Sequence, residues 1–124
     1  MLMIALIPAV AENKDAKPSV RFDNTAHDFG QIPEEGGYAS CVFSFTNEGD
    51  APLVIISASA QCGCTRPSFP QKPIDPGKKG EIKVTYNPQG RPGEFIKEVK
   101  VKTNDPKHRT TKLKISGVVL PYRR

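Results

Sequence analysis

Apolar and polar side chains alternate most clearly between Tyr38 and Thr46. Cys41, Phe43 and Phe45 fall on one side of this alternation, and the serines and the threonine between and around them fall on the other. Successive side chains of a β-strand point to opposite faces of its sheet. The pattern therefore predicts an antiparallel strand with one face in the core and Cys41 as a small buried apolar residue.

The same period of two returns towards the C-terminus. It covers Ile82–Tyr86, Phe95–Val101 and Lys112–Leu120, and the segments between them contain Gly, Pro, Asn and Asp. No window shows a helical period of 3.6 residues. Short strands separated by turns about every eight to twelve residues predict an all-β fold, an immunoglobulin-like antiparallel β-sandwich of about seven to eight strands.

Two predictions concern the segment after the clearest strand. Asn47–Asp50 reads as a hairpin turn, because Asn and Gly tolerate positive φ. Leu53–Ile56 is an uninterrupted apolar run, which is typical of a strand buried on both faces or of a strand crossing.

The N-terminus differs from the rest of the 124-residue chain. An apolar run ends in Ala9-Val10-Ala11 and is followed by charged residues, which resembles the end of a secretory signal peptide. We therefore expect residues 1–18 to be a leader remnant with a flexible segment, and residues 19–121 to be the sandwich domain. The expected mature chain begins near Glu12, has no transmembrane segment and is periplasmic or secreted. The alternative is an apolar tail that packs against the domain.

Cys62-Gly63-Cys64 is the most distinctive motif. In a flat strand its two thiols would be too far apart for a disulfide, so a Cys62–Cys64 bond requires a bend, which Gly63 could supply through backbone angles closed to other residues. The alternatives are a redox-active pair and ligands for a soft metal ion. A zinc site would need further ligands, and the candidates are Cys41, His27 and His108. A structural role for the thiols is favoured, because a single C-x-C is weak evidence for a metal.

The charge of +5 is concentrated at the C-terminal end. The alternation predicts that four lysines line one outer face, as a patch that could attract anionic glycan, phospholipid or an acidic partner: Lys100, Lys102, Lys112 and Lys114. A solvated face that guards against edge-to-edge aggregation is the favoured interpretation. Nucleic acid is not expected as a partner, since no aromatic side chains interleave with the lysines.

The sequence carries little that predicts catalysis. His27 and Asp28 are neighbours, but neighbouring side chains in a strand point opposite ways. Asp28 is expected instead to cap backbone amides near Gly30. No phosphate-binding loop or nucleophile elbow is present in the sequence. We predict a protein that is not an enzyme and that has no cofactor.

Five motifs in order resemble a bacterial family of unknown function, number 1573 in the domain-of-unknown-function series, which is abundant in Bacteroidetes. They are His27–Ile32, Phe43–Gly49, Cys62–Thr65, Ile74–Gly77 and Thr103–Asp105. The resemblance implies a fold related to Hydin-type and major-sperm-protein-like immunoglobulin domains, usually exported and without established activity. Cys62–Thr65 matches the family signature, whereas Cys41 does not belong to it.

These observations predict an exported, non-enzymatic binding or assembly module of the bacterial cell envelope, whose partner is a protein or an envelope polymer. The alternative is a thiol-based protein that uses Cys62 and Cys64 for redox chemistry or for holding a soft metal.

Overall fold

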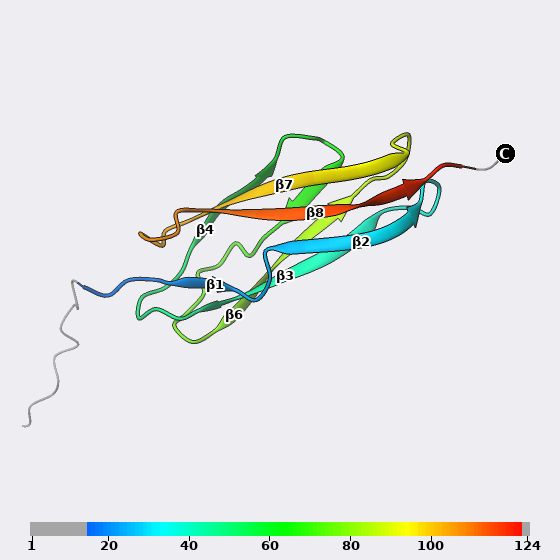
Figure 1. Ribbon diagram of the computed structural model, residues 1–124. Coiled ribbons are helices and arrows are strands. Elements are labelled where there is room, and N and C mark those ends of the chain that lie inside the picture. The colour runs from blue at the N-terminus through cyan, green and yellow to red at the C-terminus, as the bar shows by residue number, and fades with distance from the viewer. Residues whose placement is uncertain (1–14, 123–124) are drawn as a thin grey trace, which may run out of the picture.

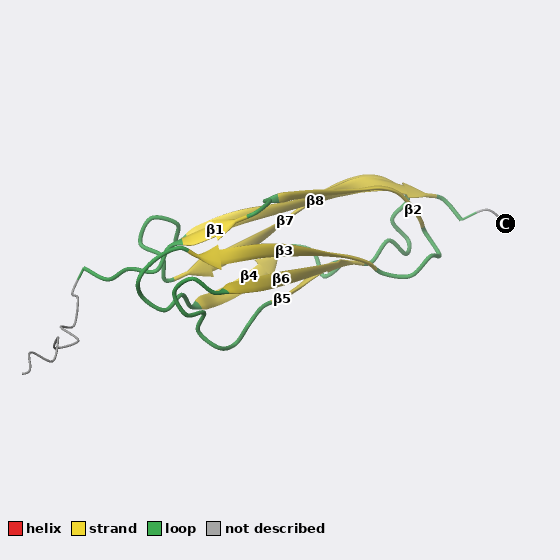
Figure 2. Cartoon of the chain, turned by 90° about the horizontal axis from the view of Figure 1, so that it is seen from below, coloured by secondary structure: helices red, strands yellow, loops and turns green. Residues whose placement is uncertain are grey.

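The computed structural model describes residues 15–122, which form an elongated sandwich of two β-sheets (Figures 1 and 2). The eight strands are β1 (Val20–Phe22), β2 (Ala26–Pro33), β3 (Ala39–Asn47), β4 (Ile55–Ala60), β5 (Thr65–Ser68), β6 (Lys79–Tyr86), β7 (Gly93–Thr103) and β8 (Thr110–Leu120). The predicted leader and the expected cleavage point near Glu12 lie outside the described residues. The described residues contain no helix long and apolar enough to cross a membrane.

Each sheet has four strands, in the orders β1-β3-β6-β5 and β2-β8-β7-β4. Alternate residues of β3 and β6 face those of β7 and β8 and make a continuous core, in which Phe45, Ile82, Val99 and Leu113 are fully buried. Cys41 is buried among them, as the alternation predicts. The predicted immunoglobulin-like sandwich is confirmed.

One strand pair departs from the antiparallel expectation. β2 runs parallel to β8, and its register shifts between Asp28 and Gln31. Gly30 takes a φ of 68° at this irregularity, and its amide donates to Asp28 Oδ1 at 2.8 Å. Asp28 therefore has the capping role expected from the sequence. The long chain between β2 and β8 allows either direction, because no tight hairpin connects the two strands.

The prediction of a hairpin at Asn47–Asp50 is wrong. This segment carries the chain from β3 in one sheet to β4 in the other. Neither Asn47 nor Gly49 has positive φ. Gly49 is required for space instead, because a Cβ there would lie 2.2 Å from the carbonyl oxygen of Lys17.

The strand predicted at Leu53–Ile56 is displaced. Leu53 is fully buried but forms only an isolated bridge with Ile74, and β4 begins at Ile55. Ile56 is 59% exposed, at an irregularity in the register of β4 on β7. The run is apolar because the chain crosses the core there and not because a strand is covered on both faces.

Candidate functional site

The chain leaves β4 after Ala60 and enters β5, in the opposite sheet, at Thr65. The Thr65 amide donates to the Cys62 carbonyl at 3.1 Å, which closes a turn around Gly63. The Asn87 amide donates to the Cys64 carbonyl at 2.8 Å and ties the turn to the end of β6. The C-x-C motif therefore makes the crossover between the two sheets.

In the structure the Cys62 and Cys64 sulfurs are 2.07 Å apart and form a disulfide. The sequence suggested that Gly63 could supply the bend through backbone angles closed to other residues, but its φ is not positive and a Cβ there would meet nothing within 4 Å. An ordinary turn brings the cysteines together. The Cys64 amide donates to Cys62 Sγ at 3.1 Å, and Cys64 Sγ lies 3.6 Å from Thr65 Oγ1.

The crossover leaves part of β7 uncovered. β4 pairs with β7 only from Ala60 opposite Val99 to Ile55 opposite Thr103. Residues 93–98 of β7 pair with β8 on one side only. Within the described residues, no loop or side chain donates a hydrogen bond to this stretch or accepts one from it on its other side. Residues 93–98 therefore form a free sheet edge.

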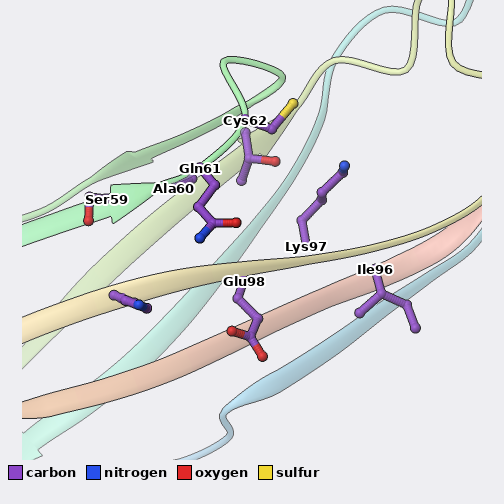
Figure 3. Close-up of a pocket in the computed structure, with 9 residues that line it drawn as sticks. Ser59, Ala60, Gln61, Cys62, Ile96, Lys97 and Glu98 are labelled. Carbon is purple, nitrogen blue, oxygen red and sulfur yellow. The ribbon is translucent and has the colours of Figure 1, made fainter.

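A cavity of about 620 Å³ opens beside this edge, between the end of β4 and β7 (Figure 3). It is lined by Ser59, Ala60, Gln61, Cys62, Thr65, Ile96, Lys97, Glu98 and Lys100. In Figure 3 the Lys97 side chain extends from β7 towards the segment that holds Cys62.

Lys97 has an unusual place in β7. It alternates with the buried Phe95 and Val99, so it belongs to the inward-facing row, and it is only partly exposed. Its neighbour Ile96 is on the outer face and is 66% exposed. Lys97 was not among the predicted site residues, although a lysine in the apolar phase of a strand is visible in the sequence.

The four predicted lysines lie on the outer face of the β2-β8-β7-β4 sheet. Lys100 is directly opposite Lys112, and Lys114 is opposite Glu98. All four side chains are exposed, and among residues 15–122 no ion pair joins them to a carboxylate. The arrangement is a positively charged surface with one interspersed acid.

The other candidate ligands are not brought together. Cys41 is in the core, His27 is on edge strand β2, and His108 is in the turn between β7 and β8. The part of the chain that the structure describes contains no group of three His, Cys, Asp or Glu side chains able to hold a metal ion. Burial raises the pKa of the Cys41 thiol to about 11, which keeps it protonated and unreactive in the folded protein.

Three solved structures show what this fold resembles. A protein of unknown function from Porphyromonas gingivalis W83 has 17% identity and a TM-score of 0.73, and the match covers 91% of this chain and 51% of that one. The PapD-like domain 7 of human CEP192 has 16% identity and a TM-score of 0.64, with 99% of both chains covered. The periplasmic chaperone SfaE has 15% identity and a TM-score of 0.55, with 85% and 59% covered.

These likenesses show the fold alone. This chain spans about half the length of the Porphyromonas protein. Similar regions also occur within larger chains, including two proteases of Vibrio cholerae. No curated protein matches the sequence. The model of a family described as proteins of unknown function, DUF1573, matches residues 20–119, so this chain belongs to that family.

Proposed function

We propose that this chain is an exported module that binds an extended polypeptide segment along the free edge of β7. One observation carries the proposal: β7 has eleven residues, and β4 covers it only from Val99 to Thr103. The remaining stretch, residues 93–98, presents unpaired backbone groups beside a cavity.

An added strand would satisfy these groups. Alternate residues of a strand direct both their N–H and their C=O towards the same neighbour, so main-chain hydrogen bonds alone would give a partner segment affinity. The bound segment would pair with β7 in line with β4, beyond the end of that strand. Its inward side chains would enter the cavity beside Cys62. Specificity would come from those side chains.

Lys97 defines the chemistry of the partner. An inward-facing charge at a free edge opposes pairing with a wholly apolar strand, which protects the protein from self-association. A segment with an acidic side chain opposite Lys97 would form an ion pair in the cavity, and an apolar residue on its other face would cover Ile96. The expected ligand is therefore an extended segment with alternating residues and one inward Asp or Glu.

The wider context supports a binding module of the cell envelope. The fold resembles that of a periplasmic chaperone, a protein class that binds other polypeptides, and the N-terminal sequence resembles the end of a signal peptide.

The proposal can be tested with a phage-displayed library of random heptapeptides. Selected peptides should carry alternating residues with one acid, and they should shift the amide NMR signals of residues 93–98. Ile96→Lys should weaken binding about tenfold or more. Val42→Lys is the matched control, because Val42 is a 49% exposed apolar residue on the outer face of the other sheet.

Charge reversal makes the test sharper. Lys97→Glu should change the preference of the selected peptides from acidic to basic residues, because the charge that the inward side chain meets is inverted. Binders that map to another surface, or that bind Ile96→Lys as tightly as the natural chain, would refute the proposal.

Export is tested separately. The intact mass of the protein, recovered from cells that express the gene with its own leader, should correspond to a chain that starts near Glu12. A mass that still includes residues 1–11 would contradict export while leaving the binding proposal open to its own test.

A further inference from the structure

The two sulfurs of the disulfide differ in access. Cys62 is only partly buried and lines the cavity beside β7, whereas Cys64 is 3% exposed. A disulfide is broken when a thiolate attacks one of its sulfurs, and the rate depends on access to that sulfur. Cys64 borders a separate cavity of about 330 Å³ beside β5 and β6, but it is almost fully buried there. An external thiolate therefore reaches Cys62 more readily than Cys64 in the folded protein.

The surroundings of Cys62 favour negative charge on its sulfur. The Cys64 amide donates to Cys62 Sγ at 3.1 Å. Lys97, Lys100 and Glu98 line the same cavity as Cys62, so positive charge outweighs negative charge there. Hydrogen bonds to the charged form and a nearby cation both favour a thiolate over a thiol. Once the disulfide is open, Cys62 is thus placed to act as a nucleophile and as a good leaving group.

The surroundings of Cys64 can stabilise the thiolate that is released from it. Cys64 Sγ lies 3.6 Å from the hydroxyl oxygen of the buried Thr65. That hydroxyl can donate to Cys64 when it carries negative charge. The turn should also keep the two cysteines close after the bond opens, because the bond from the Thr65 amide to the Cys62 carbonyl, 3.1 Å in the disulfide form, involves neither sulfur.

We propose that Cys62 is a thiol–disulfide exchange site. The sulfur of an incoming thiolate bonds to Cys62 Sγ while the bond between Cys62 and Cys64 breaks. Cys64 leaves as a thiolate and takes a proton from water. The incoming sulfur is oxidised and Cys64 is reduced, so the step needs no other oxidant and leaves a mixed disulfide on Cys62.

The attacking group is a thiolate, either of a low-molecular-weight thiol or of a cysteine in another polypeptide. One thiolate reacts with one protein molecule. The exchange does not depend on strand addition to β7. A chain that binds no peptide at that edge would still exchange at Cys62, so the two proposals fail separately.

Single-cysteine access is measured with two variants and oxidised glutathione as the probe. Cys64→Ala leaves the Cys62 thiol facing the cavity, and Cys62→Ala leaves the buried Cys64 thiol. We expect the first variant to form the glutathione mixed disulfide about 100-fold faster than the second.

The role of Lys97 is tested in the Cys64→Ala background. Adding Lys97→Gln should slow the reaction with oxidised glutathione several-fold at neutral pH and raise the pH at which the rate is half-maximal. Lys100→Gln is the matched control from the same cavity and should have a smaller effect.

The unmodified protein supplies an internal control in Cys41. This thiol is 7% exposed, so its alkylation reports opening of the whole sandwich. The protein is incubated with reduced glutathione, and at each time a sample is pulsed with iodoacetamide, quenched with acid and analysed by mass spectrometry. The Cys62–Cys64 disulfide should open while Cys41 stays unalkylated. Faster reaction with a cysteine-containing heptapeptide than with glutathione would identify a polypeptide thiol as the partner, and the reverse order would identify a small thiol.

Two results would overturn the proposal. One is equal reactivity of the Cys62 and Cys64 thiols in the two variants. The other is a disulfide that opens only as fast as Cys41 is alkylated, since the bond would then be reached by unfolding alone.

Discussion

At the scale of single residues, Asn47 shows how a side chain that reads as part of a turn can hold the core together. It is fully buried at the end of β3. Its Oδ1 accepts from the amides of Ser19 at 3.2 Å and Gly49 at 2.9 Å. Its Nδ2 donates to the carbonyls of Ala51 at 2.8 Å and Ile74 at 2.9 Å. One amide group therefore joins β3 to three separate segments.

Asn47→Ala should lower the free energy of unfolding by on the order of 4 kcal/mol, because it leaves several buried backbone groups without partners. Urea unfolding followed by fluorescence or circular dichroism measures the change.

Asn104→Ala is the control. The Asn104 amide also bridges two backbone groups, Val54 N and Pro52 O, but it is exposed. Water can replace it, so a loss of about 1 kcal/mol is expected. Equal losses would show that burial of Asn47 adds nothing.

At the scale of elements, Asp105 anchors the short strand β1 to the turn between β7 and β8. Its carboxylate is 1% exposed and accepts from the amides of Val20 and Lys107, each at 2.9 Å. His108 Nδ1 lies 3.3 Å away. Burial alone would raise the pKa of Asp105, but the hydrogen bonds from Val20, Lys107 and His108 outweigh it and hold the pKa below 3.8.

This lowered pKa predicts a loss of stability in acid. A carboxyl whose pKa is lower in the folded than in the unfolded state contributes stability above its unfolded value and loses it as the pH falls through the folded value. The contribution of Asp105 should therefore be complete above pH of about 4 and decline below it.

Asp105→Asn should cost about 2 kcal/mol at neutral pH, because neutral hydrogen bonds replace charge-assisted ones. The measurement is urea unfolding of both proteins between neutral pH and strong acid. The difference in unfolding free energy should shrink below pH of about 4. A difference that stays constant across the range would mean that Asp105 does not titrate with folding.

The elements with a clear period of two were predictable from the sequence, because one face of each meets the core. β3, β6, β7 and β8 all follow this pattern. β5 did not stand out, since Arg66 and Pro67 interrupt any alternation in its four residues. The parallel pairing of β2 with β8 had no local signal, because strand direction depends on partners distant in the sequence.

At the scale of the whole molecule, the site depends on which strands become neighbours. The C-x-C motif is visible in the sequence, but its position at a sheet crossover is not. The free edge arises because β4, with six residues, lies beside β7, with eleven. Lys97 could have been noticed as a charge in the apolar phase, whereas the cavity beside it required the fold.

The outer face of the β2-β8-β7-β4 sheet leads to a last prediction, about the charge of the molecule. The chain has a sequence pI near 9.2, and Lys100 stands directly opposite Lys112 on neighbouring antiparallel strands. Like charges in that position destabilise a sheet, and opposite charges stabilise it. Lys112→Glu should therefore raise the unfolding free energy by about 0.5 kcal/mol at low ionic strength, and the gain should shrink in about 1 M salt.

Lys83→Glu is the control. It changes the net charge by the same amount, but the residues opposite Lys83 on the neighbouring strands are the uncharged Val42 and Ser68. If both variants gain equal stability, the net charge of the molecule is responsible and the Lys100–Lys112 pair is not. If Lys112→Glu loses stability while Lys83→Glu does not, repulsion between the four lysines does not destabilise the sheet, and they form a simple solvated face.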